Sequence, residues 1–195
     1  MDRELRTETA ASESTSGHKP KVFVIVGTPD MGKMDLAMDV INLVDDLTFV
    51  DVPESPHYSL GSLADYRAEL FNALQRYFVQ MEHYKNGEDQ IVTHSLIDSF
   101  AWAIYNTQRR IANNTFDEEG AEAVNAIFIG QILLDSLAAD HIFLVEGWSD
   151  DDNMILFERM AAIARNLNVP ITVLYEEDKD KWPEICAKIV KEIRG

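Results

Sequence analysis

Short apolar runs alternate with longer stretches of helical periodicity along most of this chain. Residues 22–26 form a continuous apolar run, which is typical of a strand buried on both faces of a sheet. Between such runs, apolar residues recur every three or four positions, as on one face of a helix. The pattern predicts strands at residues 22–26, 47–52, 90–94, 141–146 and 170–175. It predicts helices at residues 33–44, 63–84, 97–111, 118–138, 152–167 and 183–194.

Five strands separated by helices of this length indicate an α/β fold. The sheet is expected to be parallel, with helices on both of its faces. No linker divides residues 21–195, so we expect one domain there. Residues 1–20 are polar and poor in apolar side chains, which predicts a disordered tail.

The amino-acid composition and the net charge limit the kinds of partner that this protein is expected to bind. The chain has 195 residues, of which 46% are hydrophobic and 26% charged, so it can bury a core of ordinary size. Its formal net charge of -17 argues against a nucleic-acid or anionic membrane surface as partner. No apolar stretch is long enough to span a membrane and no signal peptide is recognisable, so we expect a cytoplasmic protein.

The single cysteine, Cys186, lies on the apolar face of the last predicted helix. A lone cysteine forms no internal disulfide, and we expect it in the core. The alternative is a reactive thiol, which requires an exposed and electropositive setting.

The first predicted strand leads directly into a glycine-bounded loop that ends in lysine. The pattern G-x-x-x-x-G-K-[ST] marks a phosphate-binding P-loop, because backbone N–H groups converge on phosphate oxygens and the lysine reaches the outer phosphates. The usual hydroxyl that binds Mg²⁺ is replaced here by methionine. The alternative is an ordinary strand-to-helix turn in which Lys33 is solvated. The candidate phosphate-binding residues are Gly27, Thr28, Pro29, Asp30, Met31, Gly32, Lys33 and Met34.

Ligands of open parallel sheets bind beyond the carboxyl ends of the strands. Asp51 follows the second predicted strand, and Thr93-His94 closes the third. The unperturbed pKa of histidine lies near neutrality, so His94 can act as a base, although a structural histidine is the alternative. The candidate catalytic residues are therefore Lys33, Asp51 and His94.

Taken together, the loop, the order of elements and the segment Thr93-His94-Ser95 resemble the small P-loop kinases of nucleosides, nucleoside monophosphates or nicotinamide riboside, including phage-encoded members. The resemblance covers roughly residues 21 to 194. It implies a three-layer P-loop fold with a five-stranded parallel sheet, ATP or GTP as the nucleoside triphosphate, Mg²⁺, and a small-molecule acceptor.

Several positions depart from that family's pattern. Thr93-His94 stands where the family has Asp-Arg, and an acidic segment at residues 147–153 stands where lid arginines are usual. Asp51 and Glu146 are candidates for a substitute carboxylate that serves a metal ion or the acceptor. Arg109 and Arg110 are candidate phosphate clamps, although basic residues also suit the C-terminal end of a helix.

Two functions of different classes follow. The first is a nucleotide-binding protein with a kinase-like site and slow phosphotransfer. The second is a kinase-derived protein without catalysis, which acts through a protein partner or as a homo-oligomer. Fold alone does not choose between them, since a fold persists after its site is lost.

Overall fold

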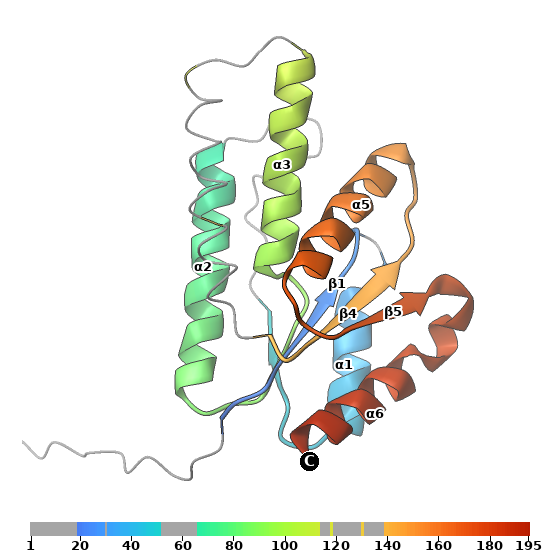
Figure 1. Cartoon of the computed structure of the whole chain (residues 1–195). Coiled ribbons are helices and arrows are strands. Elements are labelled where there is room, and N and C mark those ends of the chain that lie inside the picture. The colour runs from blue at the N-terminus through green and yellow to red at the C-terminus, as the bar shows by residue number, and fades with distance from the viewer. Residues whose placement is uncertain (1–18, 30, 52–65, 114–117, 119–129, 131–138) are drawn as a thin grey trace, which may run out of the picture.

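The computed structural model describes residues 19–29, 31–51, 66–113, 118, 130 and 139–195. Its centre is a five-stranded parallel sheet with the strand order β2-β3-β1-β4-β5 (Figure 1). The five predicted strands are confirmed, although three are shorter than the pattern suggested. They are β1 (Val22–Val26), β2 (Thr48–Val50), β3 (Gln90–Val92), β4 (His141–Glu146) and β5 (Ile171–Tyr175).

Five of the predicted helices are confirmed to within a few residues at each end. They are α1 (Lys33–Leu43), α2 (Tyr66–Lys85), α3 (Leu96–Ala112), α5 (Asp151–Asn166) and α6 (Trp182–Arg194). A 3₁₀ helix over Glu176–Lys181, which the periodicity did not predict, precedes α6. The predicted tail up to residue 18 and the predicted helix at 118–138, apart from residues 118 and 130, lie outside the described residues.

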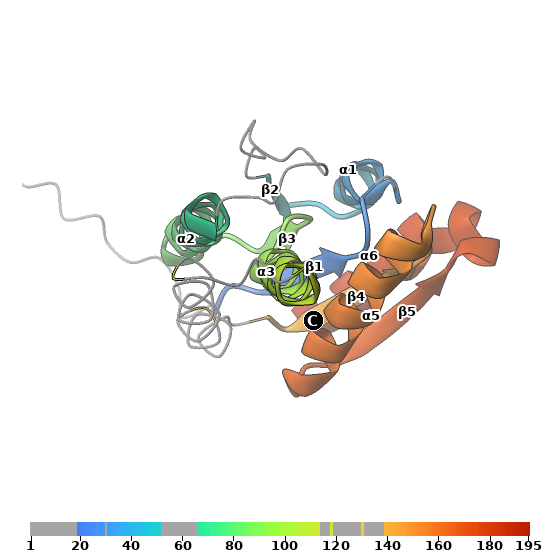
Figure 2. The same cartoon turned by 90° about the horizontal axis from the view of Figure 1, so that it is seen from above.

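Alternate side chains of β1 divide the molecule into three layers. Val22, Val24 and Val26 pack in one buried cluster with residues of α2, α3 and α5. Phe23 and Ile25 point to the opposite face and pack in a second cluster with α1 and α6. Figure 2 shows α1 on one side of the sheet and α2 and α3 on the other. The three-layer α/β architecture predicted from the sequence is confirmed.

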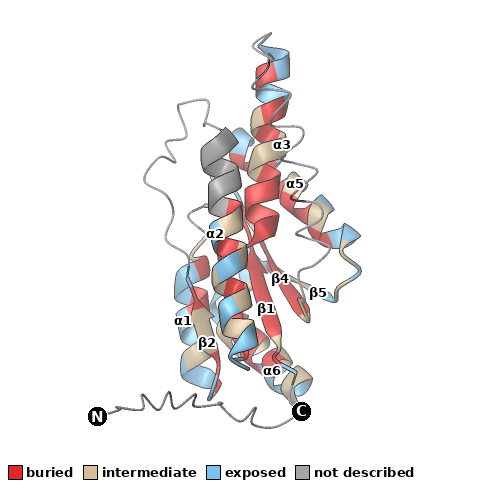
Figure 3. Cartoon of the chain, turned by 90° about the vertical axis from the view of Figure 1, so that its left-hand side faces the viewer, coloured by how far each residue is buried: buried red, intermediate tan, exposed pale blue. Residues whose placement is uncertain are grey.

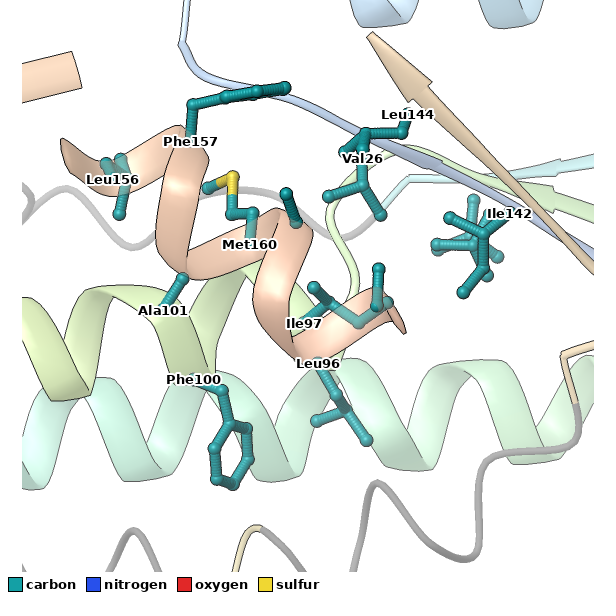
Figure 4. Close-up of a cluster of buried hydrophobic side chains, with 14 of the residues drawn as sticks. Val26, Leu96, Ile97, Phe100, Ala101, Ile142, Leu144, Leu156, Phe157 and Met160 are labelled. Atoms are coloured by element: carbon teal, nitrogen blue, oxygen red, sulfur yellow. The ribbon is translucent and has the colours of Figure 1, made fainter. Parts of the chain in front are cut away.

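The larger cluster fixes α3 and α5 over the sheet (Figure 4). Ile97 and Ala101 of α3, Leu156 and Met160 of α5, and Leu144 of β4 are each at most 2% exposed. Figure 3 shows this burial at the centre of the molecule, with exposed residues on the outer faces of the helices. Burial of a large apolar side chain contributes about 1.5–3 kcal/mol, so this contact holds the start of α3 firmly in place.

All five strands end at the same edge of the sheet, because they are parallel. The loop that follows β1 and the segments that follow β2, β3 and β4 therefore meet there. Helix α3 begins at this edge with Leu96 and, beside α2, extends past the strands (Figures 1 and 3). Four of the candidate site residues, Lys33, Asp51, His94 and Glu146, lie at this edge.

The predicted core position of Cys186 is confirmed. Its side chain is fully buried in the cluster between α1, α6 and the sheet. Burial raises the pKa of the thiol to about 12, so the reactive thiolate is strongly disfavoured.

Among the helices that the structure describes, none combines the length and apolar character that a membrane span needs.

One buried histidine gives the fold a testable pH dependence. His141 is 7% exposed, and its Nε2 lies 2.9 Å from Thr172 Oγ1. Burial lowers the pKa of His141 in the folded chain. In the unfolded chain the pKa of a histidine is about 6.5. As the pH falls through that pKa, the unfolded chain therefore binds more protons than the folded chain. The free energy of unfolding is therefore expected to fall as the pH drops from about 6.5 toward the folded pKa.

We expect His141→Gln to remove this part of the acid sensitivity, which amounts to at most about 1.4 kcal/mol per pH unit. Urea unfolding of both proteins at several pH values between neutral and mildly acidic measures it. Thr172→Val is the matched control, since it removes the hydrogen-bond partner and leaves the titrating group, and it should keep the acid dependence of the parent. An unchanged acid dependence in His141→Gln would contradict the assignment.

Candidate functional site

The glycines of the loop between β1 and α1 are required by its geometry. A Cβ on Gly27 would lie 3.1 Å from both Cβ and the carbonyl oxygen of Val145, so only glycine fits without a shift of β4. Gly32 has a φ of 69°, in the left-handed region that favours glycine, and it is the N-cap of α1. Gly32 has no side chain that could cap this helix, so within the described residues the first N–H groups of α1 have no acceptor from an N-cap side chain. Such groups are suited to binding an anion.

Contacts with the end of β4 hold the loop in place. Thr28 is fully buried and its hydroxyl donates to the carbonyl oxygen of Gly147, at 2.9 Å. A Cβ on Gly147 would lie 2.4 Å from the sulfur of Met31, so this glycine lets the loop pack closely. Asp30 lies outside the described residues. Met34, at the predicted Mg²⁺ position, is 45% exposed.

Lys33 is buried, and the alternative of a solvated lysine is wrong. Its side chain is 9% exposed. Nζ donates to the carbonyl oxygen of Gly27 at 2.5 Å and to Oδ1 of Asp98 at 3.1 Å. The lysine therefore lies under its own loop, where it already holds one carboxylate.

Asp98 is a site residue that the sequence analysis missed. It lies in the first turn of α3 and closes a capping box with Ser95, whose backbone N–H and hydroxyl both donate to Oδ2, at 3.0 and 2.6 Å. Burial would raise the pKa of Asp98, but the Lys33 ammonium, the Ser95 hydroxyl and the Arg76 guanidinium together hold it below its ordinary value. The carboxylate is therefore charged and a weak base. The spacing Ser95-x-x-Asp98 was the signal that predicts this cap.

Asp51 and His94 meet at the ends of the neighbouring strands β2 and β3. Oδ1 of Asp51 lies 3.4 Å from Nδ1 of His94, which is also 3.4 Å from Oγ1 of Thr93. A carboxylate beside an imidazole can fix the orientation of the ring through a hydrogen bond. The structure thus brings together the two residues that the sequence nominated separately for acid–base chemistry.

Glu146 lies apart from the Asp51–His94 pair. It is the last residue of β4, and the strand order separates β4 from β2 by two intervening strands. Three strand spacings amount to about 14 Å, so Asp51 and Glu146 do not share one metal ion. Within the described ranges, no group of three His, Cys, Asp or Glu side chains is placed to hold a metal. Each of the two remains a separate candidate for an ion that also binds phosphate oxygens.

Comparisons with known proteins agree with this architecture. No protein-family model and no curated protein sequence matches the chain. Among solved structures, the NadR protein in complex with NR superposes with a TM-score of 0.68 at 12% identity, over 91% of this chain and 50% of that one. Deoxyadenosine kinase from M. mycoides with bound dCTP gives a TM-score of 0.60 at 13% identity, over 88% and 99% of the two chains. The chain has the fold of the P-loop kinases.

Thymidylate kinase from Candida albicans shares the same fold, with a TM-score of 0.61 at 13% identity over 91% of this chain and 94% of that one. The chain spans about half the length of the NadR protein but nearly the whole length of the two other kinases. The resemblance seen in the sequence is therefore matched in three dimensions as a shared P-loop kinase fold.

The acidic segment after β4 forms the N-cap and the first turn of helix α5. Asp150 is the N-cap of α5, and its carboxylate accepts the backbone N–H of Asn153 at 2.7 Å. Asp152 lies 3.9 Å from the guanidinium of Arg109. These acids stabilise the start of α5 and its contact with α3.

The two arginines at the end of α3 lie far along that helix. Arg109 Nη1 lies 3.3 Å from the hydroxyl of Tyr105, and its guanidinium lies over that ring. Arg110 is 6% exposed. Eleven residues separate Asp98 from Arg109, which corresponds to about 16 Å along the helix. The structure therefore places these arginines away from Lys33, and their role as phosphate clamps stays a prediction.

Proposed function

We propose that this protein binds the phosphates of a nucleoside triphosphate, ATP or GTP, at the loop from Gly27 to Lys33. The observation that carries the proposal is the start of α1. Gly32, the N-cap of α1, has no side chain that could cap the helix, and the ammonium of Lys33, the first helical residue, reaches back to the carbonyl oxygen of Gly27. This combination of an uncapped helix and a lysine suits a polyphosphate.

We further propose that any phosphotransfer to a small-molecule acceptor is slow. Thr93 replaces the carboxylate of the resembled kinases, and Asp98 is a weak base whose two oxygens already accept hydrogen bonds. Among the described residues, the pair of Asp51 and His94 is then a further candidate for acid–base chemistry at this edge. The acceptor hydroxyl would be held beside it.

The second function, a kinase-derived protein without catalysis, is favoured by one observation. Lys33 is buried and paired with Asp98, as a structural lysine would be. In that case the loop serves the fold, and the protein acts through a protein partner or a second copy of itself.

Weak dependence on Mg²⁺ is part of the proposal. Met34 offers no hydroxyl to the metal, and its thioether is a poor ligand for a hard cation. A carboxylate such as Asp51 or Glu146 would have to supply the missing oxygen.

Thermal melting with ATP or GTP, with and without Mg²⁺, tests the proposal. Nucleotide at about 100 times its Kd adds roughly 2.7 kcal/mol, which raises the Tm of a protein of this size by about 5–10 °C. We expect that rise in the parent with little change on adding Mg²⁺, and we expect Lys33→Met to remove most of it. Lys85→Met, at an exposed position that ends α2, is the matched control and should keep it.

Two results would contradict the proposal. No rise in Tm at millimolar nucleotide would favour the protein without catalysis. An equal rise in Lys33→Met and the parent would move nucleotide binding away from this loop.

A further inference from the structure

The lysine of the loop already has a charged partner in the folded chain. Lys33 Nζ lies 3.1 Å from Asp98 Oδ1, and the two side chains are 9% and 5% exposed. Little water reaches this pair, so the carboxylate compensates the ammonium at close range. An incoming phosphate therefore meets a lysine whose charge is largely compensated, with a fixed negative charge behind it.

Hydrogen bonds from both Lys33 and Ser95 hold Asp98 in this position. Its Oδ2 accepts two hydrogen bonds from Ser95, and α3 itself is anchored by the buried core. A second buried cation, Arg76, is 4% exposed and donates to Ser99 Oγ at 2.6 Å. The charges of Lys33 and Arg76 both lower the pKa of the Asp98 carboxyl. It cannot swing away without leaving these partners.

We propose that Asp98 sets the affinity of the loop for phosphate by competing for Lys33. This inference rests on the proposed function, because it concerns the same phosphate site. Asp98 is then a positioning residue that keeps the lysine folded under the loop and weakens the binding of anions. The loop would hold nucleotide weakly until something draws Asp98 and Lys33 apart.

Neutralising the carboxylate should therefore tighten binding. Asp98→Asn keeps the size of the side chain and one acceptor for Ser95, but leaves Lys33 and Arg76 uncompensated. We expect the Kd for ATP and for inorganic tripolyphosphate, measured by calorimetry at one salt concentration, to fall about tenfold or more. Tripolyphosphate reports on phosphate binding without the base. If the asparagine variant melts below the assay temperature, Asp98→Ser replaces it in the same test. The serine removes the same charge and places no amide N–H₂ group beside the Lys33 ammonium.

Two controls separate this contact from the general field of an acidic protein. Asp39→Asn removes one negative charge from the exposed face of α1 and should change each Kd by less than about twofold, since exposed charges are screened. The double variant Lys33→Met/Asp98→Asn should bind no more tightly than Lys33→Met alone, because the gain acts through the lysine.

The outcomes distinguish this inference from the proposed function. Binding by the parent that weakens in Lys33→Met but does not tighten in either Asp98 variant would overturn this inference alone. An equal gain in Asp39→Asn, or a gain that persists in the double variant, would also overturn it. If neither the parent nor any variant binds either probe, both proposals fail.

Discussion

Replacing Lys33 by alanine is expected to lower the free energy of unfolding by about 3–5 kcal/mol, because it leaves a buried carboxylate without its main partner. Asp98 is 3% exposed, and its remaining contacts, the hydrogen bonds from Ser95 and the field of Arg76, do not replace an ammonium at 3.1 Å. Urea unfolding without nucleotide measures the loss. The matched control is Lys85→Ala at an exposed site, which should change stability by no more than about 0.5 kcal/mol.

A double-mutant cycle shows whether the loss comes from the pair. Removing both charges in Lys33→Ala/Asp98→Ala should cost clearly less than the sum of the two single changes, since neither buried charge is then left alone. Additive costs, or a loss below about 1 kcal/mol for Lys33→Ala, would show that the two side chains are solvated and apart in solution.

The first strand, the loop and α1 could be predicted from the sequence because their signals are local. A continuous apolar run predicts a buried strand, and two glycines that flank four residues predict the turn that follows it. Gly27 and Gly32 are needed for the reasons that the motif implies, close approach to β4 and a left-handed conformation. The alternation of strands and helices was enough to predict three layers.

The environment of Lys33 could not be predicted in the same way. The lysine and Asp98 are 65 positions apart, and they meet only because β1 and β3 are neighbours and α3 starts directly beyond β3. Nothing local to Lys33 reports that contact, so a solvated first-turn lysine stayed open as the alternative interpretation. The strand order likewise explains why Asp51 reaches His94 but not Glu146, although all three are strand-end residues.

Turnover is where we expect the largest departure from the kinases that share this fold. Kinases typically turn over at about 1–100 s⁻¹, and losing one acid–base or charge-stabilising group typically costs about 10²- to 10³-fold. Here Thr93 has no carboxylate, and the acids after β4 cap α5 where lid arginines would act. We therefore expect the parent to phosphorylate nucleosides, nucleoside monophosphates or nicotinamide riboside more slowly than about 0.1 s⁻¹ with ATP or GTP.

The double variant Thr93→Asp/His94→Arg restores the pair found in the resembled kinases and should raise the rate on the best acceptor by about 10²-fold, provided the loop binds nucleotide. Its matched control adds Lys33→Met, which should abolish the gain. A coupled assay of nucleoside diphosphate release, checked by mass measurement of the product, follows both proteins. Phosphorylation by the parent at an ordinary kinase rate, lost in Lys33→Met and in His94→Gln, would contradict the expectation of slow turnover. It would show instead that His94, oriented by Asp51, takes the proton of the acceptor hydroxyl as that oxygen attacks the terminal phosphorus and the nucleoside diphosphate leaves with the bridging oxygen.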